Sequence, residues 1–404
     1  MNRSYRILPC YTGDVSGAAS ALYELGGMVV IHDPSGCNST YNTHDETRWY
    51  DNDSLIFISG LSQREAIFGD DGKFIDDIVE AAGKLKPKFI AVTSSPIPFM
   101  NGTDFNAIAK IVQDRTGIFT FHVPTNGMHD YLVGAANAFE AVARFLADLP
   151  ESDLDQPRVK INILGLTPLD FSKGAAEFVR RRLEVAGFEI VSCWSYGCSF
   201  SDIGRSGDAD VNLVVSATGY RAALVLKKKY GIPFVCGCPV NIFENILYDM
   251  IRKAATDKTD CIAYKGDAYG IERVEGPAET SGLSVKQVLL IGEPVAMSSL
   301  AAVLGKSYGA KTKVACPLEL KKAGAEELLR EGDVICDGEE EIEAVIQTAD
   351  LVIADPMYSM VMQDSAKLIG LPHLAFSGRE FTWQKEDVDD VFNFFQNVDL
   401  ERLT

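Results

Sequence analysis

One local pattern repeats along the whole sequence: a short β-branched apolar run, a turn rich in Gly, Pro or Ser, then an amphipathic helical stretch. Such alternation is typical of parallel sheets covered by helices. The 404 residues are too many for one ordinary core and predict two or three domains. We therefore expect an α/β protein made of doubly wound parallel sheets.

The pattern divides into three blocks, which predict domains at residues 1–155, 156–284 and 285–404. The polar stretch Pro150–Pro157 is expected to be a linker, and a charged connection at Gly266–Gly282 closes the second block. Among the predicted strands are Met28–Ile31, Phe89–Thr93, Phe119–His122, Val159–Leu164, Glu189–Cys193, Val211–Ser216, Pro233–Val235, Gln287–Ile291, Thr312–Ala315, Val334–Cys336 and Leu351–Ala354. The last strand is predicted at His373–Phe376, and a C-terminal helix at Glu386–Asn397.

In open α/β sheets, ligands bind outside the carboxyl ends of the strands. Three such sheets in one chain direct several strand ends at a shared central cleft. The loops that follow the strands are therefore where we expect the functional residues.

Composition excludes several classes of function. The net charge of −19 argues against binding to nucleic acid or to an anionic membrane and suits a partner with a basic face. The N-terminus has no apolar signal-peptide core, and no apolar run reaches the ~20 residues that span a bilayer. We expect a cytoplasmic protein, whose nine cysteines are buried thiols or metal ligands rather than a disulfide framework.

Two cysteines lie at predicted strand-to-helix turns. Cys10 precedes a predicted helix, and Cys37 ends the turn Pro-Ser-Gly-Cys after a predicted strand. A helix N-terminus lowers the pKa of a thiol, and the thiolate is the form that binds iron. Because a [4Fe–4S] cluster normally takes four cysteines, two more ligands would come from another chain. The alternative is a pair of buried structural cysteines.

Two serines and one histidine lie near this region in the sequence. Ser94 and Ser95 follow a buried strand, where they could cap the next helix or present hydroxyls to a metal site. His44 lies in a polar loop shortly after Cys37. It is a candidate proton donor, although a solvated loop histidine is the more common case.

Further cysteines are candidates for the wall of the cleft. Cys236 and Cys238 follow a predicted strand, and Cys198 follows another. They could line the cleft or hold a second metal centre, but the sequence has no second pair at zinc-finger spacing. Ordinary buried thiols are the alternative.

The sequence lacks the two common nucleotide-binding motifs. The turns that begin at Gly165 and Gly292 follow opening strands, but neither is a G-x-G-x-x-G fingerprint. No G-x-x-x-x-G-K-[ST] occurs. We therefore expect no NAD and no directly bound ATP, so any ATP hydrolysis belongs to a partner.

Several of these segments, taken in order, resemble subunits of the nitrogenase component 1 family. Cys10 and the Pro-Ser-Gly-Cys turn at Cys37 resemble that family's N-terminal cluster cysteines. Other matching segments are Leu61–Gly69, the turn Ser94–Thr103, Thr116–Ile118 with Val123–Gly127, Asn212–Ser216 through Tyr230–Phe234, and Ala349–Ile353 through Gly370–Pro372.

The resemblance implies three Rossmann-like domains around a central cleft. It implies a [4Fe–4S] cluster bridging two subunits, with Cys10 and Cys37 as this chain's ligands. The partners it implies are a second copy or a sister subunit, and an ATP-hydrolysing iron protein that docks transiently. The reaction it implies is reduction of a small molecule in the cleft.

The sequence also departs from that family. A third cluster cysteine is replaced by serine at Ser94 or Ser95, which argues against an eight-iron cluster. The cofactor-ligating cysteine is replaced near Ser216, and we find no equivalent of the cofactor histidine near the C-terminus. Dinitrogen reduction is therefore not expected, and the substrate stays open between a tetrapyrrole, a sulfur compound and another unsaturated molecule. The alternatives are a scaffold for metal-cofactor assembly and a metal-free three-domain binding protein.

Overall fold

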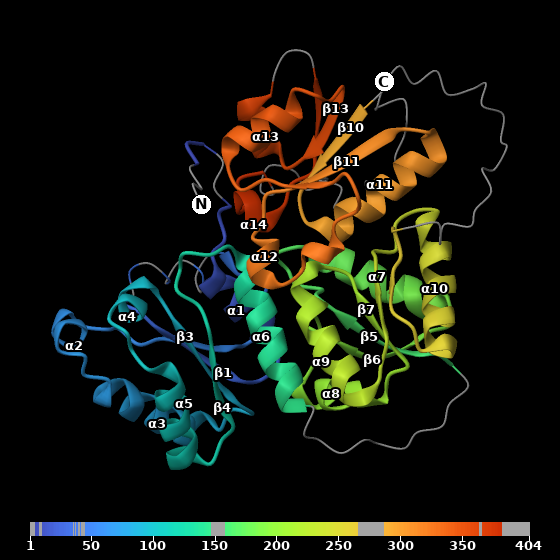
Figure 1. The fold of residues 1–404 in the computed structure, drawn as a ribbon. Coiled ribbons are helices and arrows are strands. Elements are labelled where there is room, and N and C mark those ends of the chain that lie inside the picture. The colour runs from blue at the N-terminus through green and yellow to red at the C-terminus, as the bar shows by residue number, and fades with distance from the viewer. Residues whose placement is uncertain are drawn as a thin grey trace.

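The computed structural model describes residues 5–7, 10–34, 36, 38, 41, 45–146, 158–265, 287–362 and 366–381. Within these ranges the chain forms three parallel sheets of four, five and five strands. We call the parts built on them the first, second and third units. Figure 1 shows the first and second units side by side and the third above them. The predicted α/β class with three doubly wound sheets is confirmed.

The first unit has the strand order β2-β1-β3-β4. Helices α3 and α5 pack on one face of this sheet, where Phe74, Ile78 and Val112 join the apolar core, while α1 and α6 cover the other face. Because both faces are covered, β1 and β3 are buried along their full length. The elements are α1 (Asp14–Leu22), β1 (Met28–His32), β2 (Leu55–Ile58), α2 (Gln63–Phe68), α3 (Gly72–Leu85), β3 (Ile90–Ser94), α4 (Pro96–Met100), α5 (Phe105–Thr116), β4 (Thr120–Val123) and α6 (Tyr131–Leu146).

The second unit has the strand order β6-β5-β7-β8-β9. Its elements are β5 (Lys160–Leu164), α7 (Lys173–Val185), β6 (Glu189–Cys193), α8 (Phe200–Gly204), η2 (Ser206–Asp208), β7 (Val211–Val214), η3 (Ala217–Gly219), α9 (Tyr220–Tyr230), β8 (Phe234–Cys236), α10 (Phe243–Asp257) and β9 (Cys261–Ile262). Helix α6 of the first unit packs against α9, so these two units share one apolar core.

The third unit has the strand order β12-β11-β10-β13-β14. Its elements are β10 (Gln287–Ile291), α11 (Pro294–Tyr308), β11 (Lys311–Cys316), α12 (Leu320–Ala323), η5 (Glu326–Leu328), β12 (Val334–Ile335), α13 (Glu339–Ile346), β13 (Leu351–Ala354), η6 (Pro356–Val361), β14 (Lys367–Gly370) and α14 (Leu374–Ser377).

Two predictions of local structure need correction. The last described strand is β14, not His373–Phe376, because residues 374–377 form the helical turn α14. Leu374, Ala375 and Phe376 are unbranched at Cβ and continue readily into a helical turn after Pro372. The short strand β2 was not predicted.

Some predictions lie outside the described residues. They are the linker Pro150–Pro157, the connection Gly266–Gly282 and the C-terminal helix Glu386–Asn397. The domain boundaries also fall there, so they stay predictions. Among the described helices, none has both the length and the apolar composition needed to cross a bilayer.

In each sheet the strand order reverses between two central strands: β1 and β3, β5 and β7, or β10 and β13. Loops leave the sheet in opposite directions at such a reversal, which opens a crevice where ligands bind. Ser94 and Ser95 lie at the first reversal, Ser216 at the second and Glu293 at the third. Loops at the first two reversals supply part of a cavity wall: Pro96 follows β3 and Leu169 follows β5.

Two glycines bring α1 and α6 into close contact. A Cβ atom on Gly134 would overlap the backbone carbonyl of Asp14, and one on Gly17 would overlap that of Tyr131. Without these side chains the helix ends lie together: Tyr131 N donates to Thr12 O at 3.0 Å, and Asp14 N donates to His129 O at 2.9 Å. This contact places the segment that contains Cys10 beside the N-terminus of α6.

Candidate functional site

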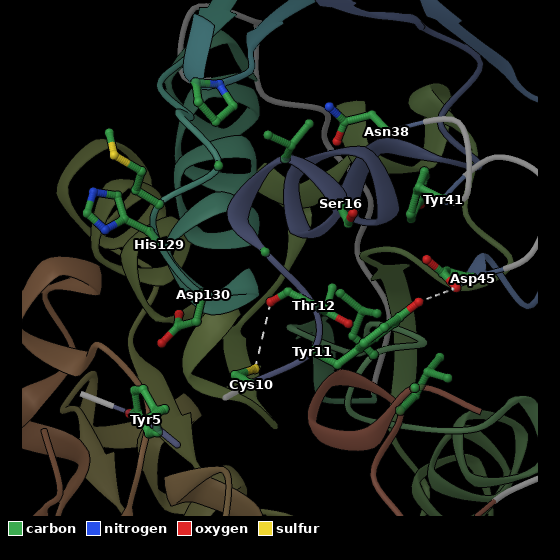
Figure 2. A pocket seen from close by; sticks show the side chains of 18 of the residues that line it. Tyr5, Cys10, Tyr11, Thr12, Ser16, Asn38, Tyr41, Asp45, His129 and Asp130 are labelled. Carbon is green, nitrogen blue, oxygen red and sulfur yellow. Dashed lines mark hydrogen bonds between the residues drawn. The ribbon is translucent and has the colours of Figure 1, made fainter. Parts of the chain in front are cut away.

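A cavity of about 610 Å³ lies where loops of all three units meet (Figure 2). Residues of the first unit make up most of its wall, while Leu169 comes from the second unit and Pro317 and Leu374 from the third. This volume is in the range typical of small-molecule sites. Its polar lining residues include Cys10, Tyr11, Thr12, Asn38, Asp45, His129 and Asp130.

Cys10 lies half-buried on the wall of this cavity, just before α1. Its thiol donates to the backbone carbonyls of Ala375 (Sγ–O 3.1 Å) and Thr12 (3.7 Å), the latter shown in Figure 2. The backbone N–H of Thr12 also donates to Ala375 O at 3.0 Å. The short helical turn α14 therefore holds the Cys10 segment against the third unit.

Two of the predicted site residues cannot be located. Cys37 and His44 both lie outside the described residues, so the separation of the two cysteines is not measured. Their neighbours Asn38, Tyr41 and Asp45 do line the cavity. The assignment of Cys37 as a metal ligand and of His44 as a proton donor therefore stays a prediction.

Ser94 and Ser95 are buried at the end of β3, next to the cavity-lining Pro96. The Ser94 hydroxyl donates to Ser95 O at 3.0 Å. Ser95 occupies the N-cap position of α4, but its side chain makes no capping bond. Its buried Oγ has no hydrogen-bond partner within the described part of the chain. An unpaired buried hydroxyl is costly, so Ser95 is the better of the two candidates to face a bound group.

The candidate cleft cysteines lie in the interior rather than on the cavity wall. Cys236 and Cys238 are fully buried, and the Cys238 thiol donates to Val215 O at 3.0 Å. Burial raises the pKa of both thiols well above its ordinary value. Cys198 is buried beside Cys193, and burial raises its pKa to about 12. These thiols stay protonated at neutral pH, which does not favour a second metal centre.

Ser216 belongs to a buried polar cluster that the sequence did not reveal. Its hydroxyl donates to Asp170 Oδ2 at 2.7 Å, and Tyr131 donates to Asp170 Oδ1 at 2.5 Å. His373 Nε2 lies 3.4 Å from Asp170 Oδ1. The first unit supplies Tyr131, the second supplies Asp170 and Ser216, and the third supplies His373.

This cluster lies directly behind the cavity wall. Leu169 and Leu374 line the cavity, and each is the chain neighbour of a cluster member, Asp170 or His373. His373 is 7% exposed, and its Nδ1 has no hydrogen-bond partner among the described residues. Asp170 lies in the loop after the predicted strand β5, which is a signal that the sequence offered, whereas His373 follows the edge strand β14, which was not predicted.

Glu293 connects the second and third units. One carboxylate oxygen accepts from Ala217 N and the other from Ala296 N, both at 2.8 Å. Burial, and secondly the nearby charge of Asp170, raises the pKa of Glu293 to about 8. The loops after β7 and β10 are thus joined through one buried carboxyl group.

Two groups on the cavity wall are suited to hydrogen bonding or proton transfer. Tyr11 donates from its hydroxyl to Asp45 Oδ1 at 3.0 Å (Figure 2). Burial, and secondly the charge of Asp45, raises the pKa of this phenol, which keeps it protonated. His129 Nδ1 lies 2.9 Å from Lys322 Nζ and 3.1 Å from Glu319 Oε2, both of the third unit.

Among the described residues, no group of three or more His, Cys, Asp or Glu side chains is placed to hold a metal ion. The cavity wall supplies one described thiol, that of Cys10. A four-thiolate cluster at this place would need Cys37 and residues of a second chain.

Comparison with known proteins gives a family match. Residues 14–380 match the family described as nitrogenase component 1 type oxidoreductase. The nitrogenase iron-molybdenum cofactor biosynthesis protein NifE of Clostridium pasteurianum is 27% identical over 244 residues, which are 56% of this chain and 52% of that protein. One of the subunits of light-independent protochlorophyllide reductase from Methylobacterium radiotolerans is 24% identical over 243 residues, 58% of this chain and 45% of that protein. The chain thus spans about half the length of each of these two relatives.

A solved structure shows the same fold. The structure of nitrogenase Cp1 at pH 6.5 superposes with a TM-score of 0.62 and 18% sequence identity. The superposition covers 92% of this chain and 87% of that one. At this level of identity the likeness concerns the fold alone.

Proposed function

Because the chain belongs to the nitrogenase component 1 type oxidoreductase family, we propose that it is an electron-accepting reductase component whose redox site is the cavity beside Cys10. In this proposal Cys10 and Cys37 are this chain's ligands to a [4Fe–4S] cluster completed by a second copy or a sister subunit. The electron donor is an ATP-hydrolysing iron protein, and the substrate is a small molecule. When bound, the cluster would supply one-electron transfer at low potential.

One observation carries this proposal. The thiol of Cys10 lies on the wall of a cavity that all three units build, and the loops around it follow the carboxyl ends of parallel strands. This is where open α/β sheets bind their ligands. A half-buried thiol at such a place is accessible to a metal, whereas Cys236 and Cys238 are sealed in the core.

The chain's own residues would bind the substrate and move protons. Tyr11, held by Asp45, presents a protonated phenol at the wall and is a candidate proton donor. Asp170 and His373 lie one residue behind the wall and would hold the loops that carry the lining residues Leu169 and Leu374. The apolar residues Val15, Leu169 and Leu374 would limit the access of water to the cavity.

A second candidate function is a scaffold for building a metal cofactor. The similarity to a protein named for cofactor biosynthesis, 27% identity over 244 residues, favours it. A scaffold would use the same cavity and the same cysteines, but it would release its metal cluster to an acceptor protein. A reductase would instead keep the cluster and turn over a small molecule.

The first experiment is anaerobic purification with iron and acid-labile sulfide quantified. We expect iron in the wild type and its loss from Cys10→Ala and from Cys37→Ala. Cys261→Ala is the matched control, since Cys261 is also half-buried but contacts Met250, away from the cavity. A metal-free wild type, or unchanged iron in both cavity variants, would contradict the proposal.

A second experiment separates reductase from scaffold. The purified iron-loaded protein is mixed with an ATP-hydrolysing iron protein and ATP, and the visible spectrum is followed under anaerobic conditions. ATP-dependent reduction with the metal retained supports the reductase. Transfer of iron to an added metal-free acceptor, without such reduction, supports the scaffold.

A further inference from the structure

A buried guanidinium group holds the cavity wall that contains Tyr41 and Asp45. Arg48 follows these residues in the loop between β1 and β2, and its side chain is only 3% exposed. It forms an ion pair with Glu46, with Nε–Oε1 2.7 Å and Nη2–Oε2 3.0 Å. A fully buried charge is tolerated only when it is paired and hydrogen-bonded.

All five N–H groups of Arg48 have an acceptor. Beyond the two bonds to Glu46, Nη1 donates to Glu24 Oε1 at 3.1 Å and to Ser195 O at 3.0 Å. Nη2 also donates to Ser20 O at 2.8 Å. A guanidinium group has five N–H donors in a fixed geometry, so this arrangement specifies the position of each acceptor.

The acceptors belong to segments that are far apart in the sequence. Ser20 and Glu24 lie in and just after α1, and Ser195 lies in the loop after β6 of the second unit. Ser195 has φ +99°, a conformation that is rare for a residue with a side chain and needs support from its surroundings. The bond from Arg48 to the Ser195 carbonyl supplies such support.

The same loop is also bonded to the third unit and to the cavity. The Glu46 carbonyl accepts from Arg379 Nη2 at 3.3 Å. The hydroxyl of Tyr41, a cavity-lining residue, donates to Glu46 Oε2 at 2.7 Å. Asp45, the partner of Tyr11, precedes Glu46 directly.

We propose that Arg48 is the positioning residue of the cavity: its ion pair with Glu46 fixes Tyr41 and Asp45 on the wall relative to all three units. Arg48 acts through these residues and does not line the cavity itself. That the cavity is a redox site rests on the proposed function. The positioning role of Arg48 is tested on iron-free protein, so a failure of this inference can be distinguished from a failure of the proposed function.

The test uses the double variant Arg48→Met/Glu46→Gln, which removes both charges and leaves neither buried alone. We expect a folded protein with unchanged far-UV circular dichroism. The ring signals of Tyr11, followed by tyrosine-labelled NMR, should shift from their wild-type positions because Asp45 is no longer held beside it. Cys10 should be alkylated about tenfold faster, since local opening of the wall exposes it.

The double variant Arg330→Met/Asp333→Asn is the matched control, because Arg330 also forms a two-point pair with a buried carboxylate, that of Asp333. The side-chain bonds of Arg330 reach Asp333 and Thr312, neither of which lines the cavity. This control should leave both the Tyr11 ring signals and the Cys10 alkylation rate unchanged. A folded Arg48→Met/Glu46→Gln protein with the Tyr11 ring signals and the Cys10 rate of the wild type would overturn the proposal.

A second measurement, on wild-type protein, tests the proposal if the Arg48→Met/Glu46→Gln variant does not fold. In wild-type protein the amide of Glu46 donates to Tyr41 O at 3.1 Å and that of Arg48 donates to Glu46 Oε1 at 3.0 Å. We expect both amides to exchange hydrogen as slowly as those of the buried strand β1. Exchange of these two amides through a low-energy local opening, while β1 stays protected, would overturn the proposal instead.

Discussion

The phenol of Tyr131, at the start of α6, donates a 2.5 Å hydrogen bond to Oδ1 of Asp170, in the loop after β5. The bond joins the first unit to the second immediately behind the cavity. Asp170 also accepts from Ser216 and Thr167 and faces His373, so four side chains meet at one carboxylate. One carboxyl group therefore contacts side chains of all three units.

Removing the Tyr131 hydroxyl should destabilise the protein by more than the loss of an ordinary hydrogen bond. For Tyr131→Phe we expect a decrease in unfolding free energy of about 1.5–3 kcal/mol, since the partner is a buried carboxylate. The matched control is Tyr264→Phe, which removes a 3.0 Å bond to the neutral Leu328 carbonyl and should cost about 1 kcal/mol. Urea unfolding measures both, and equal losses would contradict the larger contribution expected of the Tyr131–Asp170 bond.

The thiols should differ in reactivity according to their burial. In iron-free protein at pH 8 we expect iodoacetamide to modify Cys10 well before Cys236, Cys238 and Cys316, because burial raises the pKa of the latter three well above its ordinary value. Peptide mass spectrometry over a time course gives the order. Modification of Cys238 as early as Cys10 would show that the interior is open to the reagent.

The strands could be predicted well because they are buried on both faces. Runs such as Gln287–Ile291 and Leu351–Ala354 are continuous apolar segments, and the structure has strands with these bounds. Strand β14 was misplaced because it is a half-exposed edge strand, Lys-Leu-Ile-Gly, whose apolar signal is weaker than that of the helical turn after it. Periodicity detects burial, and an edge strand is only partly buried.

The site could be predicted only where residue type alone carries the chemistry. Cys10 was predicted as a ligand because a cysteine at a strand-to-helix turn is a recognisable candidate. The structure places it on the cavity wall with no described strand before it, and its role as a ligand stays a prediction. Asp170, His373 and Arg48 gave no such signal, because their roles arise from contacts between residues 39 to 203 positions apart. Such contacts depend on how three sheets pack together, which a local pattern does not encode.

The crossing of α1 and α6 should not tolerate a side chain at Gly134. In Gly134→Ala the new Cβ would overlap the Asp14 carbonyl, which is backbone and cannot rotate away. We expect a loss of stability of about 1–3 kcal/mol, or more if the helices cannot separate. The control is Gly83→Ala in the exposed part of α3, where a Cβ meets nothing and helix propensity predicts a gain of up to about 1 kcal/mol. A thermal shift measured for each variant distinguishes them, and a tolerated Gly134→Ala would contradict this helix contact.

The carboxyl group of Glu293 should make stability depend on pH in a defined direction. Its folded-state pKa is about 8, raised by burial and then by Asp170, against an ordinary value of 4.5. The folded state therefore binds this proton more tightly than the unfolded state, so the unfolding free energy should fall as pH rises from about 4.5 to 8. The upper limit of that fall is about 5 kcal/mol at 1.36 kcal/mol per pKa unit. Glu293→Gln cannot ionise and should lack this fall, whereas Glu177→Gln, on the exposed face of α7, should retain it. Urea unfolding at pH 5 and pH 8 gives the comparison, and parallel pH profiles for wild type and Glu293→Gln would show that Glu293 is already ionised at pH 5.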